Sequence, residues 1–234
     1  LNLPDKVKIV GPSAFEKVGI TEVVGRNVEV VEDSAFWGNE LTDINSSFPK
    51  LRETRGAYAF GANKLTNIDI PTLEKVSAQT FRANEITEVT LTNVKSLGEA
   101  AFVRNKIKKV ILPEVETIED LCFGADPKSD GFSGSPVEEL YAPKVKYIGK
   151  GAFIDHNLTE LSLPNVEEID FAAFAHPNSA MAALFAEWYE MYPETTVLSF
   201  EQRTLKRLYL PNVRRIGEFA FGKNKIESVK PFAY

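Results

Sequence analysis

The residue types that most often hold metals or act as nucleophiles are scarce in this sequence. It contains one cysteine, Cys122, and two histidines, His156 and His176, among 234 residues. A structural zinc site takes about four closely spaced cysteine, histidine or carboxylate ligands, and the helical histidine pair of zinc proteases does not occur either. We therefore expect no metal site and no cofactor.

A second candidate for metal binding is the segment DPKSDGFSGSP at 126–136. It is rich in glycine, serine and aspartate, which predicts a loop that interrupts the regular structure. The spacing of Asp126 and Asp130 does not match that of a calcium-binding hand, and no glutamate closes the loop. We interpret 126–136 as an insertion without a calcium site.

The amino-acid composition argues against two further classes of function, nucleic-acid binding and membrane spanning. The net charge is −6, and the chain is 44% hydrophobic and 26% charged, as is typical of a folded, soluble protein. A negative net charge argues against a nucleic-acid partner, since phosphate binding needs clustered lysine and arginine. No apolar run approaches the roughly 20 residues that a membrane span requires, so we expect no span in this segment.

A short internal repeat predicts the secondary-structure elements of the chain. The segments LPNVEEIDFAAF at 163–174 and LPNVRRIGEFAF at 210–221 are nearly identical. Each copy ends on a phenylalanine that usually follows a small residue, with apolar residues five and eight positions before it. The repeat phenylalanines are Phe15, Phe36, Phe60, Phe81, Phe102, Phe123, Phe153, Phe174 and Phe221.

The repeat also gives Cys122 a structural position. It stands immediately before Phe123, where most copies have alanine. A thiol attacks only when it is ionised, usually beside a base, so we expect Cys122 to be buried and inert. The sequence holds no phosphate-binding loop and no dinucleotide fingerprint, and its many carboxylate pairs follow from the repetition. We predict that the chain is not an enzyme.

The other half of each copy predicts a short strand. Its clearest example is NKLTNIDIP at 63–71, where apolar and polar residues alternate as in a half-buried strand. The proline that follows lacks an N–H group and ends the strand ladder. Because so short a copy encloses no core, the copies must stack and bury one another. The pattern predicts parallel strands and an interior column of phenylalanines.

These residues resemble a known family. The stretch LTELSLPNVEEIDFAAF at 158–174 is similar to the BspA-type leucine-rich repeats of bacterial and some protist surface proteins. The resemblance implies an α/β repeat fold, a curved right-handed leucine-rich-repeat solenoid over 1–234 with about nine repeats and insertions at 126–136 and 177–203. It also implies secretion, display on the cell surface, and adhesion or host interaction. No catalytic residues come with it.

Side chains that point outward from the predicted strands form two rows on the concave face of such a solenoid. The first row is acidic in its early and middle copies, and the second contains two tyrosines, a residue type enriched at binding hot spots. The ligand-binding candidates are Asp43, Asp69, Glu88, Glu139, Tyr141, Glu160, Arg207 and Tyr209. They predict a surface for a basic or mixed partner. The alternative is a solvated sheet face whose charges keep the chain soluble.

The second insertion predicts a helix. Within HPNSAMAALFAEWYEMYPE, the residues Met181, Leu184, Phe185 and Trp188 share one helical face. That face either packs onto the flank of the solenoid or leaves Trp188 and its neighbouring tyrosines as a recognition edge. On the second interpretation, Trp188 joins the ligand-binding candidates.

The leading functional hypothesis is a non-enzymatic binding or adhesion module, extracellular or at the cell surface. It would act as a monomer and recognise a protein or glycan, host-derived ligands included, through the concave face or the inserted helix. The alternative is a structural spacer or stalk that presents another domain. A third hypothesis, an accessory domain of an enzyme, requires a catalytic domain elsewhere.

Overall fold

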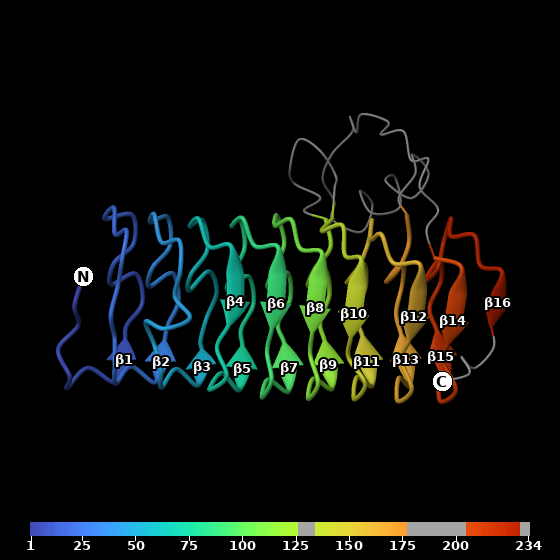
Figure 1. Cartoon of the computed structure of the whole chain (residues 1–234), viewed down its shortest axis with the longest axis horizontal. Coiled ribbons are helices and arrows are strands. Elements are labelled where there is room, and N and C mark those ends of the chain that lie inside the picture. The colour runs from blue at the N-terminus through green and yellow to red at the C-terminus, as the bar shows by residue number, and fades with distance from the viewer. Residues whose placement is uncertain (126–133, 177–204, 230–234) are drawn as a thin grey trace.

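In the computed structural model, which describes residues 1–125, 134–176 and 205–229, the chain winds into a stack of similar coils (Figure 1). Each complete coil contributes a two-residue strand to one continuous parallel sheet of nine strands. In sheet order these strands are β1 (Ile9–Val10), β2 (Val30–Val31), β3 (Glu53–Thr54), β5 (Lys75–Val76), β7 (Ser96–Leu97), β9 (Thr117–Ile118), β11 (Tyr147–Ile148), β13 (Glu168–Ile169) and β15 (Arg215–Ile216).

The strands expected from the repeat pattern form two further parallel sheets beside the first. The four-stranded sheet contains β4 (Asn67–Asp69), β6 (Glu88–Thr90), β8 (Lys109–Ile111) and β10 (Glu139–Tyr141). The three-stranded sheet contains β12 (Glu160–Ser162), β14 (Arg207–Tyr209) and β16 (Ser228–Val229). The prediction of stacked repeats with short parallel strands is therefore confirmed, whereas the nine-stranded sheet was not foreseen.

The fold prediction also included an inserted helix and a right-handed curvature. The described residues contain strands and turns but no helix. The expected helix and its recognition residue Trp188 lie within 177–204, outside the described residues. The expected right-handed curvature stays a prediction.

The phenylalanine column is present through the whole stack, as predicted. Successive rings are stacked, with centroid separations from 5.1 Å, as between Phe102 and Phe123, to 5.9 Å between Phe60 and Phe81. The rings from Phe36 to Phe174 are fully buried, while Phe15 and Phe221 at the two ends are partly buried. Each interior ring is thus covered by the rings of the coils before and after it.

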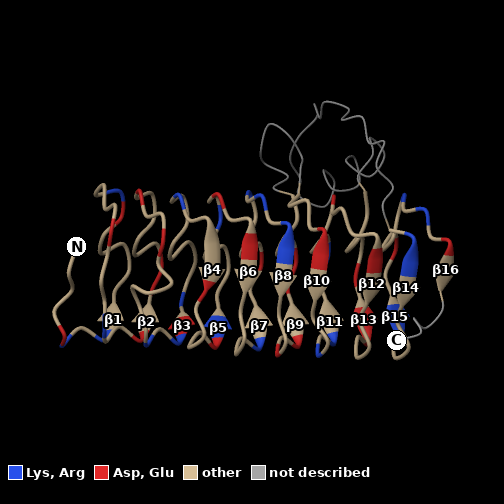
Figure 2. Ribbon diagram, in the orientation of Figure 1, with Lys and Arg blue, Asp and Glu red and all other residues tan. Residues whose placement is uncertain are grey.

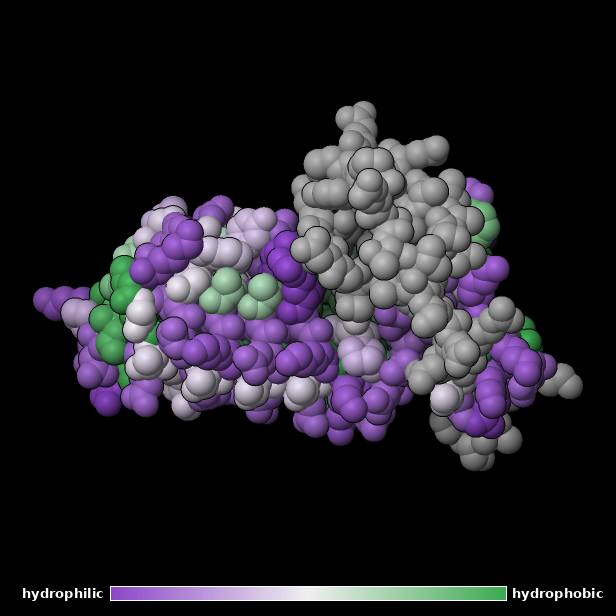
Figure 3. Space-filling view, turned by 90° about the horizontal axis from the view of Figure 1, so that it is seen from above, coloured by the Kyte–Doolittle hydropathy of each residue, from purple (hydrophilic) through white to green (hydrophobic). Residues whose placement is uncertain are grey.

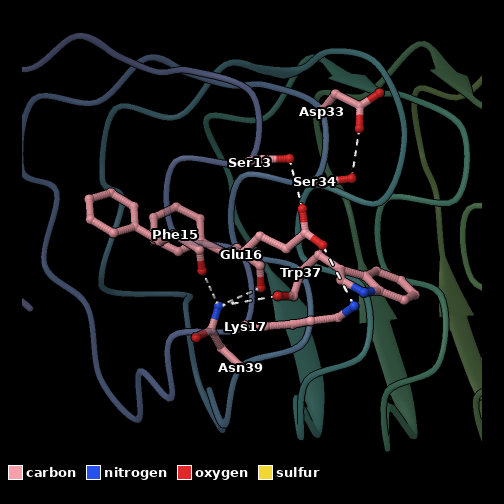
Figure 4. Close-up of polar contacts among 9 residues, drawn as sticks. Ser13, Phe15, Glu16, Lys17, Asp33, Ser34, Trp37 and Asn39 are labelled. Carbon is pink, nitrogen blue, oxygen red and sulfur yellow. Dashed lines mark hydrogen bonds and ion pairs between the residues drawn. The ribbon is translucent and has the colours of Figure 1, made fainter.

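Asparagine side chains bind several coils to the coil before them. In one example, Asn63 Nδ2 donates to the carbonyls of Phe36 and Phe60, at 2.9 and 3.1 Å. Its Oδ1 accepts a bond of 3.1 Å from the backbone N–H of Leu41. Asn39 makes the equivalent bonds to Phe15 and Phe36, at 2.7 and 3.0 Å (Figure 4). Asn84 and Asn105 repeat the arrangement, so buried turn carbonyls are satisfied across coils as well as within them.

The third repeat departs from the apolar pattern because a threonine enters the core. Thr54 pairs in register with Val31, so it occupies the place of an aliphatic residue. Its buried Oγ1 accepts a bond of 2.9 Å from the N–H of Ser77 and lies 3.0 Å from Thr80 Oγ1. A buried hydroxyl is tolerated when it is hydrogen-bonded, and here residues of the next coil supply the partners.

One row of charged side chains alternates in sign along the stack. Its members each precede a strand of the nine-stranded sheet: Lys8, Glu29, Arg52, Glu74, Lys95, Glu116, Lys146, Glu167 and Arg214. Ion pairs join Lys8 to Glu29 at 2.8 Å and Lys146 to Glu116 at 2.7 Å. Neighbouring coils therefore place opposite charges side by side, whereas a coil displaced by one position would meet a like charge.

The apolar residues that the stack exposes concentrate in its first and last coils. Leu1, Ile9 and Val18 are exposed at the N-terminal end, where hydrophobic atoms gather in Figure 3. Phe219 and Val229 are exposed in the last coils described. This distribution follows from the fold, because each coil covers the apolar edge of its neighbour.

We expect Phe102→Ala to lower the free energy of unfolding by about 3–5 kcal/mol, because it removes a fully buried ring between two stacked neighbours. Urea unfolding followed by circular dichroism measures the change. Phe219→Ala, which removes a 43% exposed ring outside the column, is the control and should cost much less. Equal losses in the two variants would contradict the importance of the column.

We expect Glu116→Lys to lower the melting temperature by roughly a few degrees at low salt. The new lysine would stand between Lys95 and Lys146, so that three neighbouring coils would carry a cation at this position. The loss should shrink at high concentrations of NaCl, where exposed charges are screened. Glu218→Lys, which reverses an exposed carboxylate outside the row, is the matched control. A loss of melting temperature that stays the same in high salt would show that the row does not act electrostatically.

Candidate ligand-binding face

The outward side chains of β4, β6, β8, β10, β12, β14 and β16 form a surface that we call the strand face. Parallel register pairs Glu88 with Lys109 and Lys109 with Glu139, which puts the three side chains in one row. Figure 2 shows the corresponding strands β6, β8 and β10 in red, blue and red. The middle residue of most of these strands is buried, as alternation along a half-buried strand requires.

Tyr141 is the most exposed aromatic residue of the strand face, with 57% of its surface accessible. Its register partner on β8 is Ile111, which is partly buried. Within the three-stranded sheet, Tyr209 pairs with Ser162, and it is also partly buried. The second predicted row therefore offers one protruding ring with a smaller apolar surface beside it.

Among the described residues, two ion pairs join charges of the first row across neighbouring coils. Lys109 Nζ lies 3.9 Å from a carboxylate oxygen of Glu139. Arg207 forms an ion pair with Glu160 on the adjacent strand. The row that the sequence indicated to be acidic thus presents both signs, because parallel pairing places a cation beside Glu88, Glu139 and Glu160.

Asp43 and Asp69 lie at the first edge of the four-stranded sheet. Asp69 belongs to β4, and its backbone N–H donates to Asn45 Oδ1 at 2.9 Å. Asn45 Nδ2 donates in turn to Asn67 Oδ1 at 2.9 Å. Asp43 lies outside the named strands, in the preceding coil, where it accepts a bond of 3.2 Å from the N–H of Asn45. Side-chain bonds therefore replace strand pairing at this edge.

The candidates do not lie on one continuous sheet. The four-stranded sheet ends at β10 and the three-stranded sheet begins at β12, and these two strands are not paired. Glu139 and Tyr141 lie on one side of this break, whereas Glu160, Arg207 and Tyr209 lie on the other. Sequence reasoning missed the break, and it also left Lys109 and Ile111 out of the candidates although their row positions identified them.

A separate cleft of about 430 Å³ lies away from the strand face. Its lining includes Pro49, Pro71 and the pair Arg52 and Glu74. The guanidinium group of Arg52 donates to both carboxylate oxygens of Glu74, at 3.0 and 3.1 Å. The charged groups of this pair are thus engaged with each other, and we do not include the cleft in the candidate site.

The chemistry of Cys122 agrees with the sequence analysis. Its side chain is fully buried, and burial is the main cause that raises the pKa of the thiol well above its ordinary value. A thiol with a raised pKa carries little thiolate, which is the nucleophilic form. The expectation of a buried thiol is confirmed, and its inertness stays a prediction.

His156 occupies the position that asparagine holds in other coils, and its ring is buried. Its Nδ1 accepts a bond of 3.0 Å from the N–H of Leu158, and its Nε2 lies 3.2 Å from the Phe174 carbonyl. Only a neutral ring protonated at Nε2 makes both bonds. Burial, followed by the neighbouring charge of His176, lowers the pKa of His156 to about 3.

The second histidine lies against the first. The ring centroids of His156 and His176 are 4.9 Å apart, and His176 Nδ1 lies 3.8 Å from a carboxylate oxygen of Asp155. Within residues 1–125, 134–176 and 205–229, histidine, cysteine and acidic side chains form no group of three or more that could hold a metal ion. The part of the chain that the structure describes also contains no helix long and apolar enough to cross a membrane.

Comparison with known proteins identifies the repeat. The family model described as "BspA type Leucine rich repeat region (6 copies)" matches residues 8–129 and 127–231. Among solved structures, a leucine-rich repeat protein from Bacteroides ovatus superposes with a TM-score of 0.54 at 14% sequence identity. The match covers 93% of this chain and 62% of that one, so this chain spans less than two thirds of its structural neighbour. No curated protein sequence matches the chain significantly.

We expect acid to destabilise the protein through His156. Its pKa is about 3 in the fold against 6.5 as the ordinary value, so the unfolded chain binds a proton first as pH falls. The contribution of neutral His156 to the free energy of unfolding is fully present above pH 6.5. It should be lost between pH 6.5 and 3, by roughly a few kcal/mol in total. Urea midpoints at neutral pH and at a pH midway between these two values measure the loss.

The matched variant for this prediction is His156→Asn, which restores the residue of the other coils. Acid also protonates carboxylates, but that contribution is common to both proteins. The difference between them therefore isolates the histidine. An identical loss of stability in the two proteins would show that His156 does not titrate on unfolding.

Proposed function

Because the chain belongs to the family of BspA type leucine-rich repeat proteins, we propose that it is a non-enzymatic binding or adhesion module. Leucine-rich repeat proteins generally act in protein interactions, and this family is typically associated with bacterial surfaces. The proposed module is extracellular or at the cell surface, acts as a monomer, and recognises a protein or glycan ligand, host-derived ligands included. The strand face is the proposed contact surface.

The observation that carries this proposal is the exposure of Tyr141 on a rigid sheet. Its backbone is held by register pairing of β10 with β8, and its ring is 57% exposed. Tyrosine supplies a large contact area with few rotatable bonds, so binding through it costs little conformational entropy. A ring fixed in this way suits either the apolar face of a sugar or an aliphatic side chain.

The surroundings of Tyr141 indicate the chemistry of the partner. Glu139 stands two residues before it on the same strand. Lys109 lies opposite Glu139 on β8 and forms an ion pair with it. Exposed ion pairs of this kind contribute little stability, so their groups can exchange partners with a ligand at small cost. The proposed ligand therefore carries both hydrogen-bond donors and acceptors, and neutral or mixed charge.

The remaining candidates define how far the proposed site extends. Asp69 and Glu88 would meet the part of a ligand that lies along β4 and β6, with Asp43 at the edge. Glu160, Arg207 and Tyr209 would form a second contact area beyond the break between the sheets. Trp188 would add a contact from the proposed inserted helix.

A structural spacer is the second candidate function. The nine-stranded sheet runs without a break from β1 to β15, and the phenylalanine column accompanies it. Continuous pairing and stacking of this kind favour a stiff rod that holds another domain at a distance. This role needs no exposed recognition residue.

We expect Tyr141→Ala to weaken ligand capture by about tenfold or more without loss of the fold, since a central aromatic contact is removed. Binding to a glycan array and to immobilised extracellular proteins measures capture, and circular dichroism checks the fold. Phe219→Ala removes an exposed ring away from the strand face and is the matched control. Equal capture by all three proteins would favour the spacer.

A further inference from the structure

Two neighbouring coils carry opposite charges. The coil that contains β12 and β13, residues 155–176, has no lysine or arginine, and we call it the acidic coil. The coil that contains β14 and β15, residues 205–225, has one carboxylate, Glu218, and we call it the basic coil. Figure 2 shows β12 and β13 in red beside β14 and β15 in blue.

Four ion pairs between described residues join these two coils, and in each of them the carboxylate belongs to the acidic coil. On the nine-stranded sheet, Arg214 lies 3.4 Å from Glu167 and Arg215 lies 3.6 Å from Asp170. Arg215 also contacts Glu168. On the strand face, Arg207 contacts Glu160. The carboxylates of this joint therefore lie on one coil and the cations on the other. We call this arrangement the charge zipper.

An earlier joint lacks this segregation. Between the coil of β8 and β9 and the coil of β10 and β11, Lys109 of the first coil pairs with Glu139 of the second. At the same joint, Glu114 and Glu116 of the first coil pair with Lys144 and Lys146 of the second, at 2.6 and 2.7 Å. Each of those coils contains both cations and carboxylates in similar numbers, so neither has a dominant sign.

The zipper lies where the chain is interrupted. Most successive repeats follow each other directly in the sequence. The insertion 126–136 lengthens the chain at the earlier joint, but the much longer segment 177–204 separates the acidic coil from the basic coil. A short connection forces a coil to stack on its predecessor, but closing a longer one costs more entropy and constrains position less. Recognition at this joint must therefore come from the contacts themselves.

The apolar contacts at the joint are those of any other joint. Ile169 pairs with Ile216, and the Phe174 and Phe221 rings stack at 5.6 Å. Because the repeats share these residues, apolar burial alone does not distinguish the acidic coil from another exposed edge. Complementary charges do distinguish it, since like-charged edges repel.

We propose that the acidic coil is a recognition surface for the basic coil, and that the acidic coil of a second copy of this chain accepts the same partner. Exchange of the basic coil between two copies reproduces every contact of the joint and needs no new surface. In a single wild-type chain the covalent connection gives the basic coil a high effective concentration at its own acidic coil. The intramolecular joint is therefore favoured when both forms are equally complementary.

The experiment makes the intramolecular joint repulsive and the intermolecular joint attractive. One variant carries Glu167→Arg and Glu168→Arg, so that two arginines face Arg214 and Arg215 across the joint. The other carries Arg214→Glu and Arg215→Glu, so that two glutamates face Glu167 and Glu168 across the joint. These changes leave the strand face untouched, and a chain with all four substitutions is the control that restores complementarity within one molecule.

Size-exclusion chromatography with light scattering gives the readout. We expect each variant alone and the fourfold control to be monomeric, and the equimolar mixture to form a one-to-one dimer that dissociates in high salt. A mixture that stays monomeric would overturn the proposal, as would a dimer formed by either variant alone. Should a double variant fail to fold by circular dichroism, the single variants Glu168→Arg and Arg215→Glu carry the same test.

Discussion

The whole structure depends on the sharing of buried surface between coils. A single coil encloses too little volume to bury its own phenylalanine, but stacked coils cover both faces of each ring. The fully buried rings from Phe36 to Phe174 show the result. Each coil is therefore stable only as a neighbour of others. The column continues even where the chain between two coils is longer, as the stacking of Phe123 on Phe153 and of Phe174 on Phe221 shows.

Polar contacts then give the stack its order. Asparagines such as Asn63 satisfy turn carbonyls of two coils at once, and His156 takes over the bridging position in the coil of Phe153. The alternating charged row adds a preference for the correct neighbour, because equivalent apolar residues cannot supply one. Where the chain is interrupted by residues 177–204, this preference becomes a zipper of separate acidic and basic coils.

The same regularity creates the surface on which the proposed function rests. Parallel register places equivalent residues of successive coils side by side at about 4.8 Å spacing, so a few substitutions within the repeat produce a patterned face. Tyr141 stands out because its neighbours are smaller or paired in charge. Binding residues can therefore change from coil to coil without disturbing the phenylalanines beneath them.

The sequence by itself determined the repeat, the column, the outward rows and the burial of Cys122, because these depend on a period that each copy restates. Only the tertiary structure decided which charges pair, that the sheet breaks between β10 and β12, and that Thr54 finds hydroxyl partners in the core. It also showed that a histidine replaces an asparagine as a bridge between coils. These features depend on contacts between residues of different coils, which a local pattern does not specify.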